Sequence, residues 1–201
     1  MISHVGRRLS HAAYPLSNRK ESMRDIITLP GIGGSGETHW QSRWEAADAP
    51  RMQRFSPSSW DRPELDDWIA ALEHAVAQSR AEPLLVAHSL SCLLVVHWAA
   101  RSRHRAGGAL LVAPPNPTSP AFPCEAAGFA DPPDTALPFP SLVIASSDDP
   151  FASLDYARTT ANGWGSEFME IGARGHINGT SGLEDWPQGR VALATLEARL
   201  S

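Results

Sequence analysis

Three short, uninterrupted apolar runs constrain the fold of this chain more than any other feature. They cover residues 84–87, 109–113 and 142–145. Runs of this length without a polar residue are typical of β-strands that are buried on both faces. Such strands occur almost only in parallel sheets that carry helices on each side, so the runs indicate an α/β protein.

The segments around these runs complete the pattern. Strands are expected at residues 25–29, 52–55, 84–87, 109–113, 142–145 and 167–171. Helices are expected at residues 37–48, 65–76, 90–103, 155–162 and 184–200. Residues 114–140, rich in proline, are expected to form a long excursion. The alternation predicts one α/β domain with a mostly parallel sheet of about six strands and helices on both faces.

The first 22 residues differ in composition from the rest of the chain. They contain four basic residues against one acid, Glu21, and no apolar run of the roughly 7–15 residues found in a secretory signal. We expect residues 1–22 to be a disordered extension and residues 23–201 to form the domain. Because no apolar stretch reaches the roughly 18 residues of a membrane span, we expect a cytoplasmic protein without a membrane partner.

Charge and residue counts exclude several classes of function. The 17 basic and 22 acidic residues give a net charge of −5, which argues against a general nucleic-acid binder. Lys20 is the only lysine and precedes the predicted domain, so the domain offers no lysine for a Walker A loop or a pyridoxal Schiff base. The histidines form no tight metal-binding motif, and Cys92 and His97 lie in an apolar helix where we expect them to pack. We therefore expect neither a metal nor an organic cofactor.

Chemistry in a parallel sheet is expected beyond the carboxyl ends of its strands. The segment Ala87-His88-Ser89-Leu90-Ser91 joins a predicted strand directly to a predicted helix. It is a variant of the G-x-S-x-G nucleophile elbow, in which a serine on a tight turn projects its hydroxyl above the sheet between small residues. Ser89 is therefore a candidate nucleophile, and the alternative is a serine that only caps the helix.

Two adjacent aspartates and a histidine follow later predicted strands. Asp148 and Asp149 follow the strand at 142–145, and His176 lies in a glycine-flanked loop after the last strand. The order serine, acid, histidine, each after a strand of its own, is that of a Ser-His-Asp triad in α/β-hydrolases. The alternative for the two aspartates is a helix cap and a solvated neighbour.

The loop after the first strand, residues 31–36, is rich in glycine. Glycines let backbone N–H groups approach a developing negative oxygen, so the N–H of Ile32 or Gly33, together with that of Leu90, is predicted to form an oxyanion hole. The same loop also matches the dinucleotide-binding pattern G-x-G-x-x-G. That alternative expects an acid about 20 residues later, where the chain has Phe55-Ser56-Pro57.

Several short motifs, taken together, resemble a known family. They are residues 30–44 (PGIGGSGETHWQSRW), 67–68 (DW), 85–92 (LVAHSLSC), 148–150 (DDP), 164–166 (WGS), 175–178 (GHIN) and 186–187 (WP). In order and spacing, from about residue 25 to the C-terminus, they are similar to small serine hydrolases of the YdeN and retinoblastoma-binding-protein-nine type. The resemblance implies a compact α/β-hydrolase fold without a large lid. It also implies Ser89 as nucleophile, His176 as base and Asp149, which precedes a proline, as the acid in preference to Asp148.

The expected reaction is hydrolysis of an ester or similar acyl bond of a small molecule through an acyl-enzyme. Ser91 departs from the family pattern, which usually has glycine there, and it adds bulk at a crowded turn. The alternative function is a non-catalytic binding protein on the same fold. Phe122, Phe129 and Phe139 in the excursion are expected to line the acyl pocket.

Overall fold

The computed structural model describes residues 23–200, so the expectation for residues 1–22 lies outside the described part of the chain. Its centre is a six-stranded sheet in the order β2-β1-β3-β4-β5-β6, and every neighbouring pair is parallel. The strands are β1 (Ile26–Leu29), β2 (Met52–Arg54), β3 (Leu84–His88), β4 (Gly108–Val112), β5 (Ser141–Ala145) and β6 (Glu167–Glu170). All six predicted strands are confirmed.

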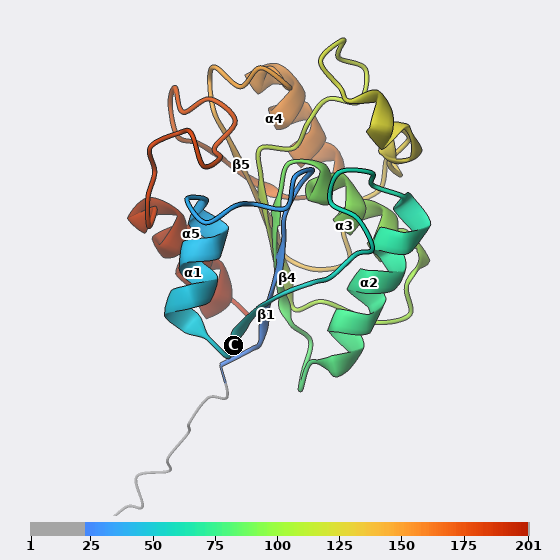
Figure 1. Cartoon of the computed structure of the whole chain (residues 1–201), viewed down its shortest axis with the longest axis vertical. Helices are drawn as coiled ribbons and strands as arrows, with labels where there is room; N and C mark the ends of the chain where they lie inside the picture. The colour runs from blue at the N-terminus through green and yellow to red at the C-terminus, as the bar shows by residue number, and fades with distance from the viewer. Residues whose placement is uncertain (1–22, 201) are drawn as a thin grey trace, which may run out of the picture.

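Helices cover both faces of the sheet, as predicted (Figure 1). They are α1 (Trp40–Asp48), α2 (Leu65–Gln78), α3 (Leu90–Arg101), α4 (Leu154–Gly163) and α5 (Pro187–Ala198), with a short 3-10 helix η1 (Cys124–Phe129) in the excursion. In Figure 1 the sheet is seen nearly edge-on, with α1 and α5 on one side and α2 and α3 on the other. None of the helices in the described region is long and apolar enough to cross a bilayer.

Two helices begin later than the sequence pattern suggests. The helix expected from residue 37 begins at Trp40, because the Nδ1 atom of His39 accepts the backbone N–H of Gln41 (3.1 Å) and caps the helix there. The helix expected from residue 184 begins at Pro187. Proline has no N–H to leave unpaired at this position, so it suits the first turn.

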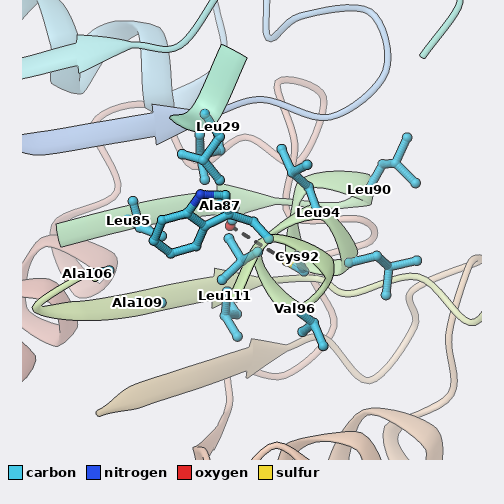
Figure 2. Close-up of a cluster of buried hydrophobic side chains, with 14 of the residues drawn as sticks. Leu29, Leu85, Ala87, Leu90, Cys92, Leu94, Val96, Ala106, Ala109 and Leu111 are labelled. Atoms are coloured by element: carbon cyan, nitrogen blue, oxygen red, sulfur yellow. Dashed lines mark hydrogen bonds between the residues drawn. The ribbon is translucent and has the colours of Figure 1, made fainter. Parts of the chain in front are cut away.

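The strands are buried on both faces, which explains their unbroken apolar sequences. In β4, Ala109 and Leu111 pack in one core layer, whereas Leu110 and Val112 pack in the other. Figure 2 shows part of the first layer, where Leu111 and its neighbours in the sheet meet side chains of α3. Cys92 of α3 is fully buried here, and burial raises the pKa of its thiol well above the usual value. The prediction that Cys92 is a packing residue is confirmed.

The sheet order creates a crevice at the carboxyl ends of two strands. The chain passes from β1 to β2 on one side and then returns to β3 on the other side of β1, so the loops after β1 and β3 turn apart. The fully buried amide of Gln41 donates to the carbonyl oxygens of Leu29 (3.3 Å) and Val86 (3.0 Å) beneath this point. The crevice is where the candidate site lies.

Candidate active site

Ser89 lies on the tight turn between β3 and α3. Its backbone has φ 54° and ψ −124°, a conformation that residues other than glycine rarely adopt. The Ser89 N–H donates to the carbonyl of Val112 (2.9 Å), which fixes the turn against the neighbouring strand. The hydroxyl makes no capping hydrogen bond to the helix, so the capping alternative does not describe this serine. The turn leaves the hydroxyl free for chemistry.

The Ser89 hydroxyl and the Asp149 carboxylate contact opposite sides of the His176 ring. The Nδ1 atom of His176 lies 2.9 Å from both carboxylate oxygens of Asp149, and its Nε2 atom lies 2.7 Å from the Oγ atom of Ser89. A carboxylate only accepts, so Nδ1 carries the proton and Nε2 presents its lone pair to the serine. The side chains of His176 and Asp149 are only 9% and 4% exposed. Bulk water is therefore largely excluded from the pair.

The two adjacent aspartates have different partners. Asp149 contacts the ring of His176, and its Oδ1 atom also accepts the N–H of Phe151 (2.9 Å). Asp148 instead accepts the Ser146 hydroxyl (2.7 Å) and the Gly175 N–H (2.7 Å), and these bonds lower the pKa of its carboxyl group. Asp148 thus holds the loop that precedes the histidine without touching its ring.

His88 supports the same loop from beneath. It is buried, and its Nε2 atom lies 2.9 Å from the carbonyl oxygen of His176, so Nε2 carries the proton and donates. Burial lowers the pKa of His88 well below the usual value, and so do the nearby His176 and His39. His88 is a neutral donor at physiological pH. Sequence reasoning missed this contact, because nothing in the local pattern relates residue 88 to a loop 88 residues later.

The glycine-rich loop approaches Ser89 closely at one residue. A Cβ atom at Gly31 would lie 2.9 Å from the Cβ of Ser89, so only glycine fits without displacement. The N–H of Gly33 donates to the Trp60 carbonyl oxygen (3.2 Å), and the N–H of Gly34 donates to Gly31 (3.1 Å). Of the two donors predicted, Gly33 is thus occupied elsewhere, and Ile32 is the candidate that remains. No backbone carbonyl within residues 23–200 accepts the N–H of Ile32.

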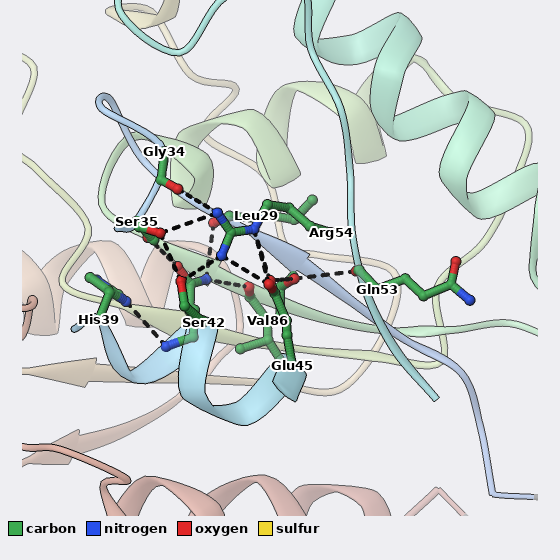
Figure 3. A network of polar contacts seen from close by, with 11 residues as sticks. Leu29, Gly34, Ser35, His39, Ser42, Glu45, Gln53, Arg54 and Val86 are labelled. Atoms are coloured by element: carbon green, nitrogen blue, oxygen red, sulfur yellow. Dashed lines mark hydrogen bonds and ion pairs between the residues drawn. The ribbon is translucent and has the colours of Figure 1, made fainter. Parts of the chain in front are cut away.

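A partly buried polar network holds this loop (Figure 3). The Arg54 guanidinium donates to the carbonyl oxygens of Gly34 (2.5 Å) and Ser35 (3.1 Å) and to the Ser42 hydroxyl (2.7 Å). Glu45 pairs with Arg54 at 2.9 Å and neutralises its charge. Sequence analysis did not identify Arg54, which stands next to the position where the dinucleotide pattern expects an acid.

A cavity of about 550 Å³ opens above Ser89 and His176. Its volume falls within the usual range for small-molecule sites. Phe122 lines the cavity, as predicted, and so does Phe151, which was not predicted. The prediction that Phe129 and Phe139 line it is wrong. Both rings belong to the core cluster on the α2 and α3 side, because the excursion folds back over these helices through η1.

Comparison with known proteins agrees with the geometry. The profile of the family described as serine hydrolase matches residues 26–195, most of the chain. The chain belongs to the serine hydrolase family. A comparison with curated proteins gives no significant match.

Solved structures give the same picture of this serine hydrolase. A YdeN-like hydrolase from Pectobacterium atrosepticum is 30% identical with a TM-score of 0.79, covering 88% of this chain and 91% of that one. The ydeN gene product of B. subtilis is 20% identical with a TM-score of 0.72, covering 87% and 99%. The type II thioesterase BorB of the borrelidin cluster is 18% identical with a TM-score of 0.60, covering 86% and 92%. The predicted resemblance and the α/β-hydrolase fold are confirmed.

The dinucleotide alternative has no structural support in this hydrolase. A dinucleotide fingerprint needs an open helix N-terminus directly after the glycines. Here α1 begins at Trp40, beyond the last glycine of the motif, and His39 occupies its first turn as a cap. The last residue of β2 is Arg54, so a base stands at the strand end next to the position where the dinucleotide pattern expects an acid.

The departure at Ser91 has a structural explanation in the hydrolase. The Ser91 side chain is fully buried, and its hydroxyl donates to the carbonyl oxygen of Pro30 (2.5 Å). The bond joins the first turn of α3 to the start of the glycine-rich loop. Ser91 has a Cβ atom and a hydroxyl that glycine, the usual residue of the family pattern, lacks. Both are accommodated at this turn, and the hydroxyl makes a hydrogen bond.

Because His39 is buried, we expect the hydrolase to lose stability in acid. Burial and the nearby Arg54 charge lower the pKa of His39 from 6.5 to about 4. Between these values the unfolded chain binds a proton that the native state does not, so stability is retained above pH 6.5 and lost as pH falls toward 4. His39 alone is expected to remove about 2 kcal/mol of unfolding free energy between pH 7 and pH 5.

Urea unfolding at both pH values measures this loss. His39→Asn keeps the capping acceptor but has no titrating ring, so the difference between the two pH values should shrink by about 2 kcal/mol. The exposed His104 provides a matched control, and His104→Asn should leave the difference unchanged. An equal pH dependence in wild type and His39→Asn would contradict the prediction.

Proposed function

We propose that this protein hydrolyses an ester or similar acyl bond of a small molecule, with Ser89 as nucleophile, His176 as base and Asp149 as the acid of the triad. The observation that carries the proposal is the continuous hydrogen-bond chain from the Ser89 hydroxyl through His176 to Asp149. A serine hydroxyl becomes a useful nucleophile when an adjacent base can take its proton and a third group orients that base.

The proposed reaction has two halves. The Ser89 Oγ atom attacks the acyl carbon while its proton passes to Nε2 of His176, and Asp149 stabilises the resulting imidazolium. The bond to the leaving oxygen then breaks, and His176 returns the proton to that oxygen, which leaves as an alcohol. Water then attacks the acyl carbon of the acyl-enzyme and gives a proton to Nε2 of His176. The bond between the acyl carbon and the Ser89 Oγ atom breaks, His176 returns the proton to that Oγ atom, and the acid leaves.

The developing oxyanion is assigned to two backbone donors. Leu90 follows Ser89 at the first position of α3, where N–H groups lack intrahelical partners. Ile32 follows Gly31, where an added Cβ atom would lie 2.9 Å from the Cβ of Ser89. Donors held in fixed positions at this point stabilise charge in the transition state.

A side chain at position 31 is expected to lower kcat more than it lowers the stability of the fold. Gly31→Ala would place its Cβ 2.9 Å from that of Ser89, so the loop must move and carry the Ile32 donor away. Loss of one such donor lowers kcat by about 10²–10³. Gly128→Ala is the matched control, because its Cβ would make only an ordinary 3.6 Å contact with Leu65. Steady-state kinetics with a p-nitrophenyl ester measure both, and equal kcat values for the two variants would refute the assignment.

A fluorophosphonate probe tests the proposed function directly. Only a serine activated by a neighbouring base reacts with it, so labelling of the wild-type protein and turnover of a short p-nitrophenyl ester are the expected results. A protein that folds but shows neither would instead be a binding protein on the same fold.

A further inference from the structure

Phe151 contacts both members of the pair formed by Asp149 and His176. Its backbone N–H donates to the Oδ1 atom of Asp149 (2.9 Å). Its ring packs against the imidazole of His176, with the ring centroids 4.5 Å apart and an angle of 54° between the planes. Aromatic rings at this separation attract one another beyond the effect of the area that they bury. One residue therefore holds the acid with its backbone and the base with its side chain.

Contacts to other segments fix the backbone of Phe151. The residue lies in the loop between β5 and α4, and its carbonyl oxygen accepts the N–H of Asn116 (3.0 Å) from the excursion after β4. Further along the same loop, the Ser153 hydroxyl caps α4 by accepting the N–H of Tyr156 (3.2 Å). Because the loop is tied to the excursion and to a capped helix, the ring contacts His176 from a fixed position.

The proposed reaction includes a stage at which the His176 ring needs such a contact. Before the reaction its two nitrogen atoms contact Ser89 and Asp149. In the acyl-enzyme the Oγ atom of Ser89 is esterified and has no proton to donate, so that Asp149 alone of these two still binds the ring firmly. Packing then decides whether the ring keeps its orientation, and the rings of Phe151 and His88 (centroid 5.0 Å from that of His176) provide it.

We propose that Phe151 is a positioning residue of this hydrolase, whose ring keeps the His176 imidazole in line between Asp149 and the acyl group throughout the reaction. The inference rests on the proposed function, in which Nε2 of His176 accepts and returns protons. His176 lines the cavity, and yet its side chain is only 9% exposed. The Phe151 ring, which lines the same cavity, contributes to this cover and limits the access of water to the bond between His176 and Asp149.

Substitutions at position 151 isolate the ring, because every residue except proline keeps the N–H that binds Asp149. Phe151→Leu remains apolar but lacks the ring, and it should lower kcat for p-nitrophenyl acetate by about tenfold, the upper range for one aromatic contact. The KM for this short ester should stay close to the wild-type value. Phe151→Tyr keeps the ring and should retain most of the wild-type kcat. Phe151→Met also lacks the ring and takes the place of Phe151→Leu if that variant does not fold.

A proton resonance measures the same contact in the absence of substrate. The Nδ1 proton shared by His176 and Asp149 gives a far-downfield line when it exchanges slowly with water, and loss of this line in Asp149→Asn assigns it. The line should broaden in Phe151→Leu and stay sharp in Phe151→Tyr. Phe168→Leu is the matched control, because the partly buried Phe168 ring of β6 contacts the Arg158 guanidinium (4.6 Å). It should leave the line and kcat unchanged.

The outcomes separate positioning from a simple wall of the cavity. A raised KM with wild-type kcat, a line that stays sharp in Phe151→Leu, or an equal loss of kcat in Phe151→Leu and Phe151→Tyr overturns the positioning role alone. Absence of both fluorophosphonate labelling and ester hydrolysis in the wild-type protein overturns the proposed function and this inference with it. Loss of kcat and of the sharp line in Phe151→Leu, with both retained in Phe151→Tyr, supports both.

Discussion

Ser89→Ala is expected to abolish fluorophosphonate labelling and to lower kcat for a short p-nitrophenyl ester by about 10⁶, to background. Removal of the nucleophile from a triad costs about this much, because the remaining donors and binding groups act only weakly on their own. The Ser89 hydroxyl is the group 2.7 Å from His176 and is not used in capping, so its loss removes the nucleophile without removing a helix cap. Labelling with mass-spectrometric mapping and ester kinetics measure the two effects.

A second variant at this position separates catalysis from folding. Ser89→Gly also lacks the hydroxyl, but glycine adopts φ 54° without strain, so it should be more stable than Ser89→Ala by about 1 kcal/mol. Urea unfolding of the two variants measures this. Both should be inactive. Labelling that persists in either, or that maps to Ser91 or Cys92, would remove Ser89 from the mechanism.

Asp149→Asn is expected to lower kcat by about 10⁴. The amide has nearly the same shape as the carboxylate, but it can donate a hydrogen bond to the His176 ring. This favours the wrong tautomer, in which Nε2 carries the proton and cannot accept the one from Ser89. The burial of both side chains prevents water from replacing the lost carboxylate. Ester hydrolysis at saturating substrate measures kcat.

The neighbouring aspartate provides the matched control. Asp148→Asn retains an oxygen that can accept the bonds from Ser146 and Gly175, and it does not touch the histidine ring. Its effect on kcat should therefore be at most about tenfold. The reverse ranking of the two variants would assign the acid of the triad to Asp148.

The sequence alone was sufficient to predict the architecture. Apolar runs such as residues 109–113 must be buried on both faces, and consecutive strands of this kind, joined by helices, have few possible arrangements. The carboxyl ends of parallel strands meet at one edge, so residues directly after different strands can be assigned to one site without coordinates. This is why Ser89, the adjacent Asp148 and Asp149, and His176 were identified as a group, whereas the preference for Asp149 over Asp148 came from the family resemblance.

Details that depend on loop conformation were not available from the sequence. The choice between Ile32 and Gly33 as donor depends on a hydrogen bond between Gly33 and Trp60, which lies in a different loop. The prediction for Phe129 and Phe139 was wrong for a related reason. The proline-rich excursion has no periodicity, so its sequence does not reveal which side chains turn into the core.

The sequence by itself determined which strands exist, what faces they bury and which reactive residues follow them, because these properties arise from local periodicity. Only the tertiary structure decided that Asp148 holds a loop while Asp149 contacts the histidine, and that His88 supports that loop through the carbonyl oxygen of His176. These roles depend on side-chain directions set by contacts between segments far apart in the chain. Local patterns carry no information about such contacts, since each becomes defined only when the segments pack together.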